Sequence, residues 1–192
     1  KRIGNIEFTS KWDTIKKGIK TDLVLTDVGA QGIRMPLKAN GYIYPTGANN
    51  IDLNIDFSNF NLSFIEPIMS EYVSNIGGFA QGNVNVYGSF SAPQMKGEIE
   101  LIRTRLKINY TNVAYTFTTH VKINPNEIRI DSIVLNDPEA NTASGYFVMK
   151  YKNFSDFNMD TRLTFNNFLA VDAPPDQNEF FYGRGLVSGA IR

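Results

Sequence analysis

The sequence predicts an all-β protein whose strands form an elongated antiparallel sheet with one apolar face. Two observations predict this fold: apolar and polar residues alternate along many short segments, and Asn, Asp, Gly and Pro separate these segments. Alternation with a period of two is typical of strands that face water on one side only. The separating residues favour the backbone angles of tight turns, as in PTGANN, NPNE and NDPEAN.

The clearest strand is the run IDLNIDF, in which four apolar residues alternate with Asp and Asn without exception. The same period recurs in further segments. These segments contain Ile33, Met35 and Leu37; Val84 and Val86; Ile99 and Leu101; Leu106, Ile108 and Tyr110; and Phe147, Met149 and Tyr151. Shorter strands are predicted at 121–123, 128–135 and 159–165. The apolar positions are odd before Arg103 and even after it, so we expect a bulge or tight bend at 103–105.

One segment departs from the period of two and predicts a single short helix near residues 66–76. Pro67 suits a first helical turn, and Gly77 with Gly78 suits a helix stop. The apolar residues recur at intervals of three and four, which predicts that they share one helical face directed at the sheet. They are Leu62, Ile65, Met69, Tyr72, Val73 and Ile76.

The chain of 192 residues has room for one domain with a core. Lys1 at the start and the strand-like GLVSGAIR at the end indicate a single fragment of a longer array. The related stretches GFAQGNV at 78–84 and GLVSGAI at 185–191 also favour an array. No stretch reaches the roughly 18–20 apolar residues of a membrane-spanning helix.

The composition favours a binding protein over an enzyme. Nineteen basic and nineteen acidic residues leave no net charge to attract nucleic acid, and the absence of cysteine excludes thiol chemistry. His120 is the only histidine and has no second ligand nearby in the sequence. Asp52 and Asp56 share a strand face, but their regular alternation is typical of solvated charges. We therefore expect no catalytic residues, no metal site and no cofactor.

A sheet with one apolar face must bury that face against something. A second sheet, closure into a barrel, or curling into a trough would each do so. A packed β-sandwich would suit an adhesin or a carbohydrate-binding protein, with Trp12, Tyr42, Tyr44 and Tyr182 as candidate sugar contacts. Periodicity alone leaves these three architectures open.

Residues 77–101, GGFAQGNVNVYGSFSAPQMKGEIEL, followed by LKINYTNVAYTF, resemble the C-terminal conserved region of the TamB family of AsmA-like translocation and assembly module proteins. The segment from Ile128 to Phe157, with Asp137, Gly145 and Phe154, is similar to the next family segment. NNFLAVDAPPDQNEFFYGRGLVSG resembles the one after it, in the style of Bacteroidetes members. Residues 1–45 share only the β texture.

The resemblance implies a U-shaped sheet, or β-taco, in an inner-membrane anchored protein that crosses the periplasm of a Gram-negative bacterium. It implies transport of phospholipid to the outer membrane, assembly of outer-membrane proteins, or both. The implied partners are phospholipid acyl chains, unfolded outer-membrane protein strands, and an outer-membrane barrel of the TamA/BamA type. The alternation predicts the groove lining as Ile51, Leu53, Ile55, Phe57, Val84, Val86, Ile99, Leu101, Phe147 and Met149, with Asp52, Asn54 and Asn85 facing water.

Overall fold

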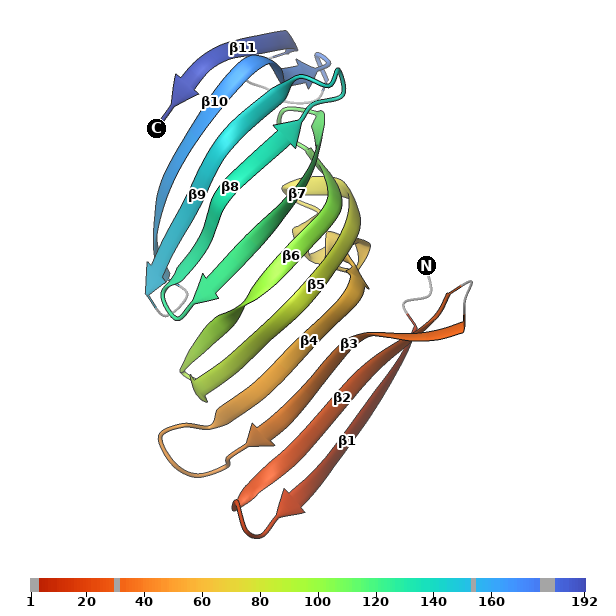
Figure 1. Ribbon diagram of the computed structural model, residues 1–192, viewed down its shortest axis with the longest axis vertical. Helices are drawn as coiled ribbons and strands as arrows, with labels where there is room; N and C mark the ends of the chain where they lie inside the picture. Colours follow the sequence, from red (N-terminus) through yellow and green to blue (C-terminus); the bar gives the residue numbers. More distant parts are fainter. Residues whose placement is uncertain (1–3, 30–31, 153–154, 177–181) are drawn as a thin grey trace.

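The computed structural model describes residues 4–29, 32–152, 155–176 and 182–192. Its strands form one sheet in which every strand pairs antiparallel with its neighbour in the sequence. Figure 1 shows them stacked from β1 at one end to β11 at the other. The strands are β1 (Asn5–Asp13), β2 (Gly18–Gly29), β3 (Gly32–Ile43), β4 (Ile51–Asn61), β5 (Val73–Ser89), β6 (Ala92–Ile108), β7 (Val113–Asn124), β8 (Glu127–Asn136), β9 (Thr142–Lys152), β10 (Ser155–Ala173) and β11 (Gly183–Ile191).

The sheet is open, because β1 and β11 lie at opposite ends of the strand order and do not pair with each other. The all-β, single-sheet prediction is therefore confirmed, and neither a sandwich nor a closed barrel forms. The turns predicted at PTGANN, NPNE and NDPEAN join β3 to β4, β7 to β8 and β8 to β9. No helix in the described part of the chain is long and apolar enough to span a membrane.

Bulges bend several strands near one level of the sheet. The register shifts after Leu25 in β2 and after Phe57 in β4, and Leu37 pairs with both of these residues. In β6 the shift lies between Leu101 and Thr104, and Arg103 has a φ of 46°. The bulge predicted at 103–105 is confirmed. Because a bulge bends its strand and increases its twist, a line of bulges curls the whole sheet.

The direction of the curl follows from a contact between β7 and β10, which are not neighbours in the sheet. Beyond the tip of the β8–β9 hairpin, the Asp172 amide donates to the Thr111 carbonyl (3.0 Å). Nearby, the rings of Tyr115 and Phe168 stack with centroids 5.0 Å apart. Both rings project from the face of the sheet that carries the apolar residues. The sheet therefore curls toward its apolar face.

The helix predicted near 66–76 is wrong in its extent. Only a 3-10 turn, η1 (Leu62–Phe64), and one α-helical turn, α1 (Glu66–Met69), form before β5 begins at Val73. The intervals of three and four in β5 have another cause. Asn75 and Gly78 have positive φ (55° and 101°), and the irregular register beside them brings Val73, Ile76 and Ala80 to one face of a strand.

The short segment covers one part of the apolar face, though with fewer residues than predicted. Leu62, Val73 and Ile76 are buried together with Ala80, and partly buried side chains of β4 and β6 pack around them. Ile65, Met69 and Tyr72 were predicted to face the sheet but are exposed, with 64% of Tyr72 accessible. A single turn of α-helix is too short to direct all six residues to one side.

Asp137 anchors the curled end of the sheet. Its carboxylate is 5% exposed and accepts bonds from the backbone amides of Glu139 (2.8 Å), Asn141 (2.9 Å) and Leu169 (2.8 Å). The Asn141 side-chain amide donates a fourth bond (3.2 Å). The carboxylate therefore ties the β8–β9 turn to β10. Burial raises the pKa of the neighbouring Tyr115 phenol, and the Asp137 charge adds to this effect.

We predict that Asp137→Ala lowers the free energy of unfolding by about 2–4 kcal/mol, because four donors lose their acceptor in a buried site. Urea denaturation followed by circular dichroism measures this change. The control is Asp131→Ala, which removes an exposed carboxylate from β8 and should leave the midpoint nearly unchanged. Equal losses in both variants would contradict the anchoring role of Asp137.

Candidate functional site

The candidate site is the apolar face of the sheet, whose register forms one continuous row across β1 to β10. Each residue of this row pairs with the next across the strand boundary, and none has a polar side chain. We call it the central apolar row: Phe8, Leu23, Ala39, Ile55, Val84, Gly97, Ile123, Ile128, Met149 and Met159. At about 4.8 Å per strand spacing, it extends roughly 43 Å.

All ten residues predicted to line a groove lie on this face. Ile55, Val84 and Met149 belong to the central apolar row itself. Leu53 pairs with Val86 beside that row. The others, Ile51, Phe57, Ile99, Leu101 and Phe147, flank the row on the same face. Asp52 is exposed on the opposite face, and Asn54 and Asn85 lie beside it, partly exposed.

The sequence prediction missed Phe8, Leu23, Ala39, Ile123, Ile128 and Met159 as members of the row. Their alternation was visible in the sequence, but only the strand register aligns them with Ile55 and Val84. Gly97 completes the row for a different reason. A Cβ atom there would stand 2.1 Å from the Asn83 carbonyl oxygen, so the close approach of β5 and β6 requires glycine at this position.

The central apolar row is only partly covered. Val84 is 5% exposed near the middle, whereas Phe8 and Met159 at the two ends are 59% and 67% exposed. Between them the side chains of Leu23, Ile55, Met149 and their neighbours are partly exposed. Apart from η1 and α1 over β5 and the contact of β7 with β10, no described element packs across the face. The face is thus an apolar strip open to a ligand along most of its length.

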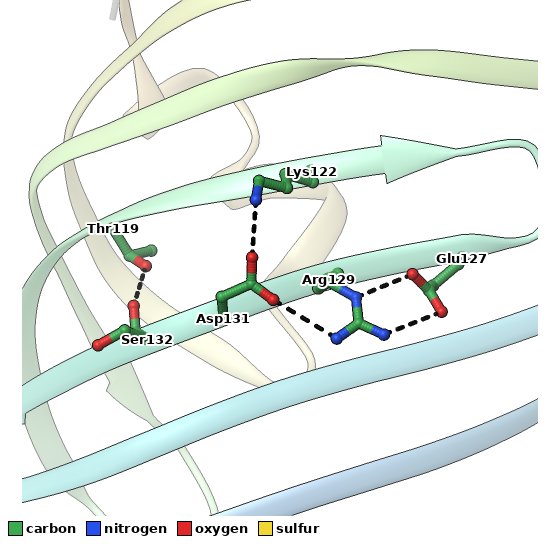
Figure 2. A network of polar contacts seen from close by, with 6 residues as sticks. All are labelled: Thr119, Lys122, Glu127, Arg129, Asp131 and Ser132. Carbon is green, nitrogen blue, oxygen red and sulfur yellow. Dashed lines mark hydrogen bonds and ion pairs between the residues drawn. The ribbon is translucent and has the colours of Figure 1, made fainter.

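The opposite face is polar, and charged side chains pair along it. Figure 2 shows the Lys122 ammonium 2.8 Å from the Asp131 carboxylate, and the Arg129 guanidinium between Glu127 (3.0 Å) and Asp131 (3.4 Å). The hydrogen bond from Lys122 is the main cause that lowers the pKa of Asp131, and that from Arg129 lowers the pKa of Glu127. These groups are solvated, so they stabilise the fold only weakly.

The predicted absence of catalytic and metal-binding groups stays a prediction, and the geometry of the candidate residues is as follows. His120 is exposed on the polar face, with Nε2 3.8 Å from the Glu100 carboxylate. The carboxylates of Asp52 and Asp56 accept bonds from the amides of Asn85 (3.3 Å) and Asn83 (2.7 Å). Within the described ranges, no three His, Asp or Glu side chains gather closely enough to hold a metal ion.

The aromatic residues considered for sugar binding do not form one surface. Tyr42 and Tyr44 stack at 6.0 Å near the β3–β4 turn, where the Tyr42 hydroxyl donates to Asp13. Trp12 projects from β1 on the apolar face, since it pairs with Ile19. Tyr182 precedes β11 at the other end of the sheet.

Two of the three residues that carry the family resemblance have structural roles. Asp137 anchors the β8–β9 turn, as described above. At Gly145 a Cβ atom would stand 1.7 Å from the Arg162 carbonyl oxygen, so no side chain fits between β9 and β10. Phe154 lies outside the described residues.

We predict that Val84→Glu destabilises the protein more than Ile55→Glu, although the two positions are paired neighbours. The Val84 site is buried, so a glutamate there costs several kcal/mol or takes up a proton. Ile55 is partly exposed, and its replacement costs about 1–2 kcal/mol of lost apolar burial. Chemical denaturation measures both values. Complete unfolding of Ile55→Glu would show that a second layer covers this face.

Comparison with known proteins identifies no relative of this chain: no family model matches it, and no curated protein and no solved structure matches it either.

Proposed function

We propose that this chain holds the acyl chains of phospholipid along its apolar face, as a periplasmic segment of a TamB-like envelope protein. The observation that carries the proposal is the central apolar row, which crosses β1 to β10 without a polar side chain and without a covering layer. The resemblance of residues 77–117 to the TamB family supports the same function.

The energy of acyl-chain burial is sufficient for binding without a specific headgroup contact. Each methylene group that leaves water gains about 0.8 kcal/mol, so a chain of about sixteen carbons gains on the order of 10 kcal/mol before ordering costs. The curl toward the apolar face allows side chains to contact a bound chain from more than one side. The solvated polar face keeps the opposite side of the sheet in water.

A row without polar groups also suits movement of lipid. No described side chain of the central apolar row offers a hydrogen bond or a charge that would hold a ligand at one point. A bound acyl chain therefore meets a similar surface at each strand. This property favours conduction of lipid along the sheet over storage at a single site.

The expected protein partners stay predictions. Unfolded outer-membrane protein strands would occupy the backbone groups at a sheet edge. An outer-membrane barrel of the TamA/BamA type and an inner-membrane anchor follow from the resemblance alone. The lipid proposal depends on the apolar face and is testable without them.

We predict that a photo-reactive amino acid in place of Val86 forms adducts with phospholipid in the periplasm of a Gram-negative host. Val86 lies on the apolar face opposite Leu53 and Met95. Adding Ile55→Glu should remove most of the adducts, because an unpaired carboxylate in the acyl-chain path costs several kcal/mol. Mass spectrometry of the cross-linked protein measures the adducts.

Gln94→Glu is the matched control, because it adds the same charge to an exposed position of β6 on the polar face, opposite Tyr87. Its adducts should equal those of the parent protein. Asn54 is less suitable as a control, since a charge there would stand between Asp52 and Asp56. If position 86 captures no lipid in the parent protein, or if a folded Ile55→Glu protein keeps its adducts, acyl-chain binding at this face is refuted.

A further inference from the structure

The outer edge of β1 is an unoccupied strand edge. Among the described residues, β1 pairs only with β2, so every second backbone amide and carbonyl on its other side lacks a strand partner. Its apolar-face side chains are also uncovered: Ile6 is 65%, Phe8 59% and Trp12 51% exposed. An edge of this kind is a template for a further strand.

The charges of β1 are arranged symmetrically about its central residue. Glu7 and Lys11 lie two residues before and after Thr9, and both project from the polar face. Neither forms an ion pair with another described residue. Lys11 pairs across the strands with Lys20, and like charges in that position are unfavourable. Lys11 therefore lacks an acidic neighbour within its own chain.

We propose that two copies of this chain associate through β1, in a two-fold symmetric antiparallel pair with Thr9 opposite Thr9. This register places Glu7 of each copy opposite Lys11 of the other, and Ile6 opposite Trp12. Cross-strand pairs of opposite charge and of apolar side chains stabilise a sheet. The same patch serves both copies, so the assembly closes as a dimer.

The alternative registers of the same two strands are less favourable. A shift by one residue would turn the apolar face of one copy to the polar side of the other. A shift by two residues in one direction sets Glu7 opposite Asp13. A shift by two in the other direction sets Glu7 opposite Thr9 and Lys11 opposite Asn5, which loses both ion pairs. Only the register centred on Thr9 pairs both charges.

The other free end of the sheet is a poorer partner for β1. The described strand β11 contains Arg184 and no acidic residue, so it offers no carboxylate to Lys11. Pairing of β1 with β11 would also be head to tail and would not close. A symmetric β1 pair instead joins two sheets into one, with both apolar faces on the same side. The apolar face would then continue from one copy into the other.

The test uses charge exchange in the full chain, followed by sedimentation velocity over a concentration series. The parent protein should dimerise reversibly. Glu7→Lys and Lys11→Glu should each raise the dissociation constant about tenfold or more, since two attractive pairs become repulsive. The double variant Glu7→Lys with Lys11→Glu restores both pairs and should dimerise like the parent. An equimolar mixture of the two single variants should form a heterodimer.

A second measurement fixes the register. The sequence has no cysteine, so Thr9→Cys introduces a unique thiol. Oxidation with copper phenanthroline should give a covalent dimer, because directly opposed residues of two strands are within disulfide reach. Lys20→Cys on β2 is the control and should not cross-link, since β1 separates it from the second copy.

A parent protein that stays monomeric at the highest concentration would overturn the proposal. Association that Glu7→Lys leaves unchanged would also overturn it and would indicate the β11 edge or the apolar face as the contact. These variants lie outside the positions that test lipid binding. Loss of dimerisation with intact lipid adducts at position 86 would therefore refute the β1 pair alone, and the reverse result would refute the acyl-chain proposal alone.

Discussion

The fold depends on one constraint: almost every strand is apolar on one face and polar on the other, while the described chain supplies no second layer to cover the apolar face. A flat sheet would leave that face in water. Bulges near Leu25, Phe57 and Leu101 bend the strands at a common level, and the resulting curl partly shields the apolar side chains. The remaining exposed strip is the basis of the proposed lipid binding.

Tertiary stabilisation is concentrated at two places along the curl. Leu62, Val73, Ile76 and Ala80 form a small core where η1 packs against β5. At the other place, the four hydrogen bonds of Asp137 hold the β8–β9 turn against β10. Between them each strand is held by its immediate neighbours, as in repeat proteins. Damage to one part of the sheet should therefore spread little to distant strands.

The sequence predicted strand content, turns and the bulge at Arg103, because period-two alternation and its change of phase are local signals. It also predicted the face on which Ile55, Val84 and Met149 lie. It failed at the helix, because the bulges at Asn75 and Gly78 give a strand the spacing of a helical face. The continuity of the central apolar row depends on register across the strands, which alternation within one strand does not determine. The anchoring role of Asp137 arises from Leu169, which is remote in the sequence.

Native mass spectrometry of the protein after gentle purification from a Gram-negative periplasm tests the central claim most directly. The account predicts that part of the population carries additional mass matching whole phospholipids. It also predicts that a charge at position 55 on the apolar face removes this mass, whereas an equal charge at position 94 on the polar face does not. A lipid-free parent protein, or lipid retained equally by both variants, would contradict the claim that the uncovered apolar face holds acyl chains.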